Sequence, residues 1–298
     1  MLFRSKEKLP RLGAHMSVAG GLPRAVERAV VHRCDAFQIF AKNANQWRGR
    51  PLPPAEIREF RAKVEMAGIG PVVSHASYLI NLATINPALR RQSMDAMADE
   101  LDRAEALGLL GVVLHPGAHT RGSEAEGLAL VAEGLVELLR ARRGTTMVLL
   151  EQTAGQGTAL GRTFEQLASM AAQAGDHPRI GVCLDTCHLV ASGYDLGSAD
   201  GYARTFRQFG RLVGFDRLKV FHVNDSKKPL GSRVDRHEHI GQGCLGLEPF
   251  RRLVNDRRFS GLPMLLEKPK KDGHAAARIA KDPFDEKNLA ILRGLIRM

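Results

Sequence analysis

Short apolar, β-branched runs in this sequence repeatedly end in a side chain that can bind a metal ion. Val-Val-Ser-His75, Val-Leu-Leu-Glu151 and Val-Cys-Leu-Asp185 show the pattern. A lone histidine at a strand end is more often a hydrogen-bonded core residue, but several such groups brought together would be costly to bury unless cations neutralised them. The sequence therefore predicts clustered metal ions. The runs end at His15, His75, His115, Glu151, Asp185, His222 and Glu267.

Two further pairs of such side chains enlarge the set. Asp185 and His188 are three residues apart at the end of one run, and Asp235 and His237 are two apart in an expected extended loop. Mixed imidazole and carboxylate ligands without thiolates favour zinc, with manganese second. The complete set is too large for one ion and would serve two or three. It consists of His75, His115, Glu151, Asp185, His188, His222, Asp235, His237 and Glu267.

Divalent cations about 3.5 to 4 Å apart suit in-line hydrolysis of a phosphodiester. One pair of ions would generate hydroxide from water near neutral pH, and another would stabilise the departing oxygen, so no protein nucleophile is needed. The net charge of +11, from 43 Lys and Arg against 32 Asp and Glu, favours a polyanionic partner. Basic residues that follow the predicted strands would hold flanking phosphates without reading sequence. They are Arg48, Arg50, Lys227, Lys228, Arg233, Arg236, Lys268, Lys270 and Lys271.

The spacing of these residues implies a ring of parallel strands. Eight apolar runs alternate with segments of helical periodicity, such as 54–67 and 87–107, and eight strands can close a barrel. We expect a single (β/α)8 TIM barrel, of class α/β, over residues 11–298 after an N-terminal extension at 1–10. An open doubly wound sheet would instead gather its ligands at one switch point. The predicted strands are Leu12–His15, Ala36–Phe40, Val72–His75, Gly111–His115, Met147–Gln152, Ile180–Asp185, Lys219–Val223 and Pro263–Glu267, and the last two helices are about Glu248–Val254 and Asp285–Arg297.

Composition sets further bounds. No run of about 18 uncharged apolar residues occurs, and the first ten residues carry charges where a signal peptide needs an apolar stretch. We expect a soluble cytoplasmic protein, associated with the nucleoid in a prokaryote. The cysteines lack the close spacing of a zinc knuckle, and we expect reduced thiols at Cys34, Cys183, Cys187 and Cys244.

Several loop motifs together resemble the endonuclease IV family of abasic-site endonucleases. The resemblance extends from about Arg11 to Glu267, nearly the whole chain. The motifs that carry it are Gly13-Ala-His15-Met-Ser17, Ser74-His75-Ala-Ser-Tyr78, Leu114-His115-Pro-Gly117, Leu150-Glu151-Gln-Thr-Ala-Gly155, Leu184-Asp185-Thr-Cys-His188, His222-Val-Asn-Asp225-Ser and Gly231-Ser-Arg-Val-Asp235-Arg-His237.

The resemblance implies a TIM barrel with three zinc ions, with manganese possible at one or more positions. Such an enzyme cleaves duplex DNA on the 5′ side of an abasic site, leaving a 3′ hydroxyl and a 5′ deoxyribose phosphate, and it also trims blocked 3′ ends in base excision repair. The bridged pair of ions would carry the attacking hydroxide. The implied ligands are His75 and His115 for one ion, Glu151 as the bridge to a second ion held by Asp185, His222 and Glu267, and His188, Asp235 and His237 for the third.

The resemblance also assigns residues to DNA recognition, in which the duplex bends and the abasic nucleotide flips out. Extrusion costs less where a missing base has already removed stacking. Tyr78 matches a wedge tyrosine, and Gln46 and Trp47 match a second recognition loop, where Asn45 replaces the arginine of some members. Trp47 could instead anchor its loop, and Tyr78 could simply pack. The other expected site residues are Arg236 at the phosphates and His15, Gln152 and Asn224, which would orient ligands by hydrogen bonds.

Two other functions fit part of this pattern. A metal-dependent sugar isomerase or epimerase would need only four ligands at strand ends, here Glu151, Asp185, His222 and Glu267. The five additional ligand candidates and the basic residues argue against it. A DNA-binding protein with a structural metal is disfavoured, because structural zinc is closed by four ligands and seldom clustered. The expected partner is therefore double-stranded DNA containing abasic sites, bound by a monomer, with no membrane association.

Overall fold

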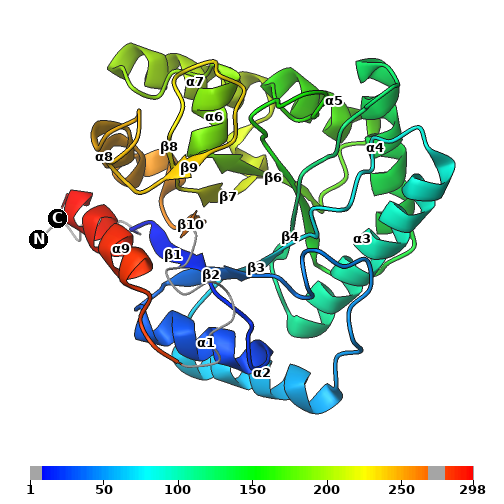
Figure 1. The fold of residues 1–298 in the computed structure, drawn as a ribbon, viewed down its shortest axis with the longest axis horizontal. Helices are drawn as coiled ribbons and strands as arrows, with labels where there is room; N and C mark the ends of the chain where they lie inside the picture. Colours follow the sequence, from blue (N-terminus) through cyan, green and yellow to red (C-terminus); the bar gives the residue numbers. More distant parts are fainter. Residues whose placement is uncertain (1–8, 268–278, 298) are drawn as a thin grey trace, which may run out of the picture.

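Eight parallel strands close a barrel at the centre of the molecule. The computed structural model describes residues 9–267 and 279–297, and the strands neighbour one another in the order β1-β10-β7-β6-β5-β4-β3-β2. Figure 1 shows this ring with the helices outside it. The predicted TIM barrel is therefore confirmed. The strands are β1 (Arg11–His15), β2 (Ala36–Ile39), β3 (Val72–His75), β4 (Gly111–Leu114), β5 (Met147–Glu151), β6 (Ile180–Asp185), β7 (Leu218–His222) and β10 (Pro263–Leu266).

Local sequence signals begin and end the outer helices. Asn86 caps α3 by accepting hydrogen bonds from the N–H groups of Ala88 and Leu89 at 3.0 and 3.1 Å. Gly108 ends α3 with a φ of 70°, which glycine adopts without strain. The helices are α1 (Leu22–Val31), α2 (Pro54–Ala67), α3 (Pro87–Leu107), α4 (Glu124–Arg140), α5 (Phe164–Gln173), α6 (Thr186–Ser192), α7 (Ala199–Leu212), α8 (Glu248–Val254) and α9 (Pro283–Leu295), with 3-10 turns at Phe215–Arg217 and Arg257–Phe259.

Apolar side chains from seven strands fill the inside of the barrel, and we call them the interior layer. All are completely buried, so the barrel is a packed core and not a channel. The eighth strand, β1, contributes Gly13, where a Cβ would lie only 1.7 Å from the carbonyl oxygen of Ala36. That close approach leaves room only for glycine. The interior layer consists of Ala36, Val73, Val113, Leu149, Cys183, Val220 and Leu265.

Six of the eight predicted strands differ from the observed bounds by one residue at one or both ends, and two departures are larger. A short antiparallel pair, β8 (Asp225–Ser226) and β9 (His237–Glu238), holds the segment that the sequence suggested was only an extended loop. Helix α9 begins earlier than the predicted range of 285–297, because Asp282 caps its first turn. Predictions on residues 1–8 and 268–278, including Lys268, Lys270 and Lys271, fall outside the described residues. Within the described ranges, no helix is long and apolar enough to cross a membrane.

Candidate metal centre

The alternation of side chains along a strand explains why polar groups converge at one end of the barrel. The residue two positions beyond each member of the interior layer points the same way, towards the barrel axis. Leu149 is thus followed by Glu151, and Val220 by His222. In every barrel strand this position lies near the carboxyl end, which we call the mouth, and is polar. These residues are His15, Gln38, His75, His115, Glu151, Asp185, His222 and Glu267.

Glu151 lies at the centre of the polar cluster and is completely buried. Its Oε2 is 3.1 Å from Nε2 of His75 and 3.0 Å from Nε2 of His115. Its Oε1 is 3.0 Å from Nδ1 of His222. The two oxygens of one carboxylate therefore face different imidazoles, an arrangement that suits a ligand shared by two ions.

The donor atoms gather into groups of the size that a metal ion requires. Those of His75, His115 and Glu151 lie within 4.8 Å of one another. Those of Glu151, Asp185, His222 and Glu267 form a second group within the same distance. The geometry is therefore compatible with the first two ligand sets that the resemblance implies.

The third implied ligand set, His188, Asp235 and His237, comes from beyond the barrel strands. Here the donor atoms within 4.8 Å of one another are those of Asp185, His188 and His237, and those of Cys187, Asp235 and His237. Asp185 caps α6 and accepts a hydrogen bond from the N–H of His188 at 3.0 Å, which fixes His188 in the first turn of that helix. An Asp235 oxygen lies 3.1 Å from Nε2 of His188, and the other lies 3.2 Å from Nε2 of His237. Cys187 is also close to Asp235 and His237. Burial raises the pKa of this thiol to about 11, so it is a weaker donor than the imidazole of His188.

The orientation of the imidazoles fits metal binding. Nδ1 of His75, His188 and His237 lies 2.8, 2.9 and 3.0 Å from a backbone carbonyl oxygen. A carbonyl only accepts, so Nδ1 carries a hydrogen and Nε2 is left to face the cluster. Among the described residues, Nε2 of His188 and of His237 has no hydrogen-bond partner, since the nearby Asp235 oxygens are close but poorly aligned. A cation between nitrogen and carboxylate would satisfy both.

Opposite charges dominate the electrostatics of the cluster. Although burial opposes charge on each member, His115 and His222 hold the pKa of Glu151 well below its usual value. Burial likewise opposes charge on His188, yet Asp185 and neighbouring carboxylates hold its pKa well above the usual value. The ionised carboxylates and the protonated imidazoles thus partly neutralise one another. Metal ions would displace those protons on binding.

Asn224 and Gln152 contact the ligands in different ways. Nδ2 of Asn224 donates to Oδ2 of Asp185 at 2.6 Å, and its Oδ1 accepts from the N–H of Glu267 at 3.0 Å. Gln152 contacts His188 through its backbone oxygen. Its side-chain amide donates instead to the backbone oxygens of Thr153 and Arg162 and to the hydroxyl of Ser192 in α6. The expected orienting contact of Gln152 therefore comes from the main chain, whereas that of Asn224 comes from its side chain.

Sequence reasoning missed Gln38, which lies among the ligand candidates. Its Oε1 is 2.8 Å from Nε2 of His222, and its Nε2 donates to Glu267 and lies 3.1 Å from Nδ1 of His15. The contact at Nε2 of His222 leaves Nδ1 of that ring to face Glu151. A signal was present, because Gln38 is the polar residue of an otherwise apolar strand and stands two positions after an interior-layer residue.

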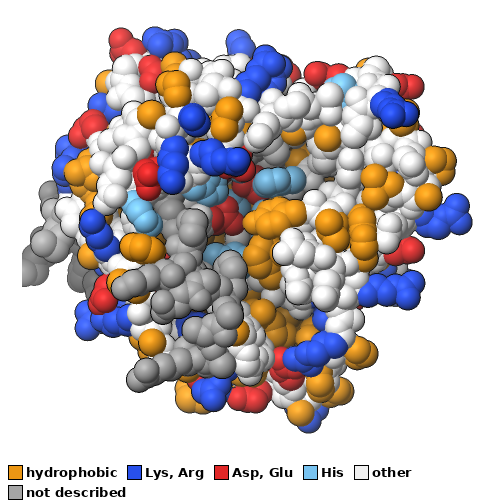
Figure 2. All heavy atoms as spheres, viewed as in Figure 1, with side chains coloured by type: hydrophobic (Ala, Val, Ile, Leu, Met, Phe, Trp, Pro, Cys, Tyr) orange, Lys and Arg blue, Asp and Glu red, His pale blue; other side chains and the backbone are white. Residues whose placement is uncertain are grey.

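The predicted DNA contacts surround the mouth. Tyr78 is 59% exposed, and its ring centroid lies 5.2 Å from that of His75. Asn45 and Gln46 are exposed, whereas Trp47 is half-buried against the core, so an anchoring role and a DNA contact are both compatible with its position. Figure 2 shows imidazoles and carboxylates in a central hollow, with Lys and Arg side chains above it and to its left. The exposed basic residues among those predicted are Arg48, Arg50, Lys227, Lys228, Arg233 and Arg236.

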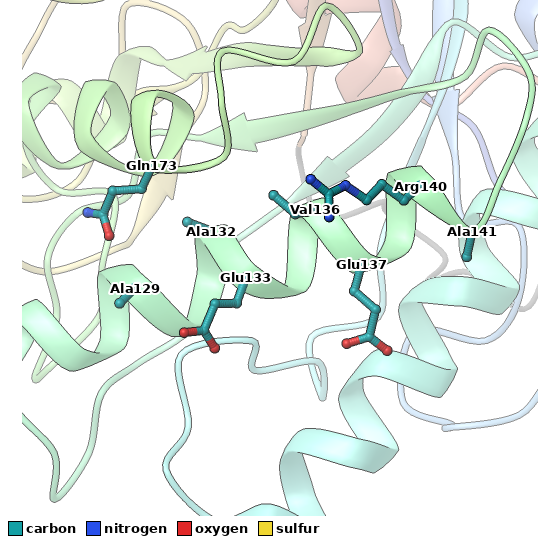
Figure 3. Close-up of a pocket in the computed structure, with 8 residues that line it drawn as sticks. All are labelled: Ala129, Ala132, Glu133, Val136, Glu137, Arg140, Ala141 and Gln173. Atoms are coloured by element: carbon teal, nitrogen blue, oxygen red, sulfur yellow. The ribbon is translucent and has the colours of Figure 1, made fainter.

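The hollow at the mouth is not the largest hollow on the described part of the protein. The one at the mouth has a volume of about 260 Å³ and is lined by Tyr78, His115, His188 and Asp235, among others. A larger hollow of about 670 Å³ lies on the outer wall of the barrel, between α4 and α5 (Figure 3). Its lining contains no histidine. The only metal-ligand types in it are two glutamates, which both come from α4. Size therefore does not identify the site, and the ligand chemistry points to the mouth.

Comparison with known proteins defines the class first. Residues 26–286 match the family described as xylose isomerase-like TIM barrel. This class agrees with the closed barrel and with the metal-ligand candidates at its mouth. A D-psicose 3-epimerase, solved in the presence of D-fructose, is 16% identical, with a TM-score of 0.67 over 95% of this chain and 97% of its own. At that identity the likeness shows the fold alone.

More similar relatives then define the family within this class. Probable endonuclease 4 from Chloroflexus aurantiacus is 51% identical over 290 residues, which are 97% of this chain and 99% of the relative. The structure of endonuclease IV from Thermus thermophilus is 39% identical, with a TM-score of 0.84 over 96% of this chain and 98% of that one. The chain belongs to the endonuclease IV family, which confirms the resemblance found in the sequence.

Proposed function

We propose that this protein is a zinc-dependent endodeoxyribonuclease of base excision repair. It hydrolyses the phosphodiester on the 5′ side of an abasic site in duplex DNA, leaves a 3′ hydroxyl and a 5′ deoxyribose phosphate, trims blocked 3′ ends, and acts as a monomer. Family membership supports the nuclease activity. The observation that carries the proposal is the convergence of several donor groups on one mouth. Two of these groups share Glu151, and a further one consists of Asp185, His188 and His237.

The donor set fits three zinc ions. When bound, these ions would lower the pKa of water and neutralise the charge of the phosphodiester. Glu151 would be the shared ligand, because its two oxygens face different imidazoles. The complete proposed ligand set is His75, His115, Glu151, Asp185, His188, His222, Asp235, His237 and Glu267.

The chain's own residues would bind and position the DNA. Exposed cations beside the mouth, such as Arg236, would neutralise phosphates, which makes binding strong at low salt and independent of sequence. Tyr78 borders the mouth pocket and is exposed enough to stack in the gap left by a flipped nucleotide. Gln46 and Trp47 would fill the gap from the other loop, with Asn45 supplying an amide and no cation.

One assay tests this proposal directly. The pure protein is incubated with a duplex containing one abasic site, with and without a chelator, and the ends of the products are mapped. We expect a cut on the 5′ side that the chelator abolishes, while a matched duplex with an intact base stays whole. Equal cutting of both duplexes, or cutting that withstands the chelator, would contradict the proposal.

A sugar epimerase is the competing function, because one donor group has the composition such enzymes need. Glu151, Asp185, His222 and Glu267 alone form that group. An epimerase function would leave the close approach of Asp235 to the imidazoles of His188 and His237 without a role. Metal analysis separates the two functions, since the nuclease should hold about three zinc or manganese ions per chain and an epimerase only one or two.

A further inference from the structure

Lys42 is a buried cation beneath one of the two loops that border the mouth. We define the first loop as residues 42–50. The Lys42 side chain is 1% exposed, and its Nζ donates to the backbone oxygens of Trp47 and Ala96 at 3.2 and 3.0 Å and to Asp99 at 3.0 Å. All three N–H bonds of the ammonium are therefore used. Burying a cation is costly unless all its hydrogen bonds are made. The loop and α3 supply these acceptors together, so Lys42 connects the loop to α3 in one arrangement.

The next residue of α3 holds the second loop, residues 76–80, which carries Tyr78. Oε1 of Glu100 accepts a hydrogen bond from the N–H of Ser77 at 3.2 Å and lies 3.6 Å from Nζ of Lys42. The hydroxyl of Ser77 donates to the backbone oxygen of Ala44 at 2.6 Å. The two loops are thus bonded to each other directly, and also through adjacent acidic residues on one helix.

Arg103 holds the far end of the first loop in the same way. Its Nε lies 2.9 Å from Asp99, and its Nη2 donates to the backbone oxygen of Arg50 at 2.7 Å. A Cβ on Gly49 would lie 2.7 Å from that Nη2 and 2.8 Å from Cβ of Lys42. At Gly49 the loop therefore packs directly onto the two cationic side chains. A hollow of about 320 Å³ lies beside it, between Trp47–Gly49 and α3, so these polar contacts and not close packing alone hold the loop.

We propose that Lys42, Glu100 and Ser77 form a positioning unit that fixes the spacing between the two DNA-recognition loops. The unit rests on the proposed function, since it presents Gln46 and Trp47 together with Tyr78 to one abasic site. Ordering both loops before DNA arrives lowers the entropy cost of binding. Among the described residues, the side chains of Lys42, Ser77 and Glu100 make no hydrogen bond or ion pair with the metal-ligand candidates, so we expect them to act on recognition and not on hydrolysis.

The role of Glu100 depends on its acceptor oxygen more than on its charge. Burial raises the pKa of Glu100 to about 7. Its Oε2 has no hydrogen-bond partner within the described part of the chain. Oε1 can accept from Ser77 in either protonation state, and an amide oxygen can do the same. Glu100→Gln therefore preserves the contact, and Glu100→Ala removes it.

The test uses the protein purified with its metals and the variants Ser77→Ala, Glu100→Ala and Glu100→Gln. Trp47 is the only tryptophan, so quenching of its fluorescence by acrylamide reports on the first loop without DNA. We expect Ser77→Ala and Glu100→Ala to increase quenching and to raise KM for an abasic duplex roughly fivefold to tenfold, the effect of losing one hydrogen bond that holds the loops together. Ser77→Ala also removes the acceptor of the Leu79 N–H within the second loop. The kcat and the zinc content should stay within about twofold of wild type, and Glu100→Gln should restore both KM and quenching.

Tyr202→Phe is the matched control, because it removes a hydrogen bond of 3.0 Å to Asp256 from α7 and touches neither loop. It should change neither quenching nor KM. Unchanged quenching and KM in Ser77→Ala would overturn the proposal, even if Glu100→Ala fails to fold. A parallel loss of kcat and zinc would overturn it too, by placing the effect at the metal centre. Failure of the wild type to cut abasic DNA would refute the proposed function alone, since quenching still tests the loop coupling.

Discussion

The interior layer and the mouth of the barrel are two residues apart on the same strands, yet they differ in chemistry. On β5, Leu149 is packed among apolar side chains, and Glu151 lies among imidazoles. Both side chains are completely buried. Burial stabilises the first through the hydrophobic effect and penalises the second unless positive charge is supplied. The strand therefore provides stability at one position and a reactive site at the next position on the same face.

Replacing Glu151 should separate the two regions most clearly. Glu151→Gln keeps the volume but removes the charge shared by two donor groups. We expect nicking of an abasic duplex to fall on the order of a thousandfold, the rate equivalent of several kcal/mol of lost transition-state stabilisation. Circular dichroism should show an unchanged fold. Cutting at near the wild-type rate would show that Glu151 is not the shared ligand.

Removing the metals should lower the stability of the protein without unfolding the barrel at room temperature. Without the ions, the buried carboxylates are neutralised only in part, by the nearby imidazoles. A chelator should therefore lower the free energy of unfolding by about 4 kcal/mol, the linkage value for a metal in thousandfold excess over its Kd. Thermal unfolding followed by circular dichroism measures the change, and added zinc should reverse it. If chelated protein unfolds at the same temperature as the untreated protein, the donor groups do not depend on cations for stability.

Leu149→Ala tests the interior layer on the same strand on which Glu151→Gln tests the mouth. Deleting a buried leucine side chain should cost about 3 kcal/mol of stability. Metal content and kcat should stay near wild type at temperatures where the variant is folded, because the donor groups are unchanged. Urea unfolding and zinc analysis together check this. Loss of zinc from the folded variant would mean that the two regions are not separable.

Tyr78→Ala sharpens the comparison within the mouth itself. The side chain borders the pocket but is not a donor, so its removal should weaken discrimination between abasic and intact duplex by roughly 1 to 2 kcal/mol, as expected for one stacking contact. Competition binding with both duplexes measures this difference, and zinc analysis serves as the control. A variant that discriminates normally would leave Tyr78 with the packing role that its ring contacts also allow.

The period of two along the strands explains what the sequence could and could not predict. Seven ligand-type strand ends followed from apolar runs that finish on polar residues, and the barrel followed from the alternation of eight apolar runs with helical segments. Gln38 was missed because its run continues to Ile39 and Phe40, so the polar residue does not stand at the end. The β8–β9 pair was missed because two-residue strands show no periodicity. The contacts of Lys42 with α3 join residues about fifty positions apart, and no local pattern indicates them.

The smallest expected effect is on stability and comes from Asp256, which lies on the outside of the barrel. This effect should not depend on bound metal. Burial opposes charge on Asp256, yet hydrogen bonds from Arg258 and Tyr202 hold its pKa below the usual value. A lowered folded pKa means that the stabilisation is complete above the unfolded value of about 4 and is lost as pH falls through the folded value. Asp256→Asn should therefore cost about 1 kcal/mol near pH 7.

The gap between Asp256→Asn and wild type should close as pH falls below about 4, because the wild-type carboxyl then protonates as well. Urea unfolding across this range, with and without chelator, measures it. Since Asp256 lies outside the donor groups, the gap near pH 7 should be the same in chelator. If this stability difference vanished on chelation, the contribution of Asp256 would depend on the metal centre. Stabilising and reactive positions could then not be separated at this part of the barrel.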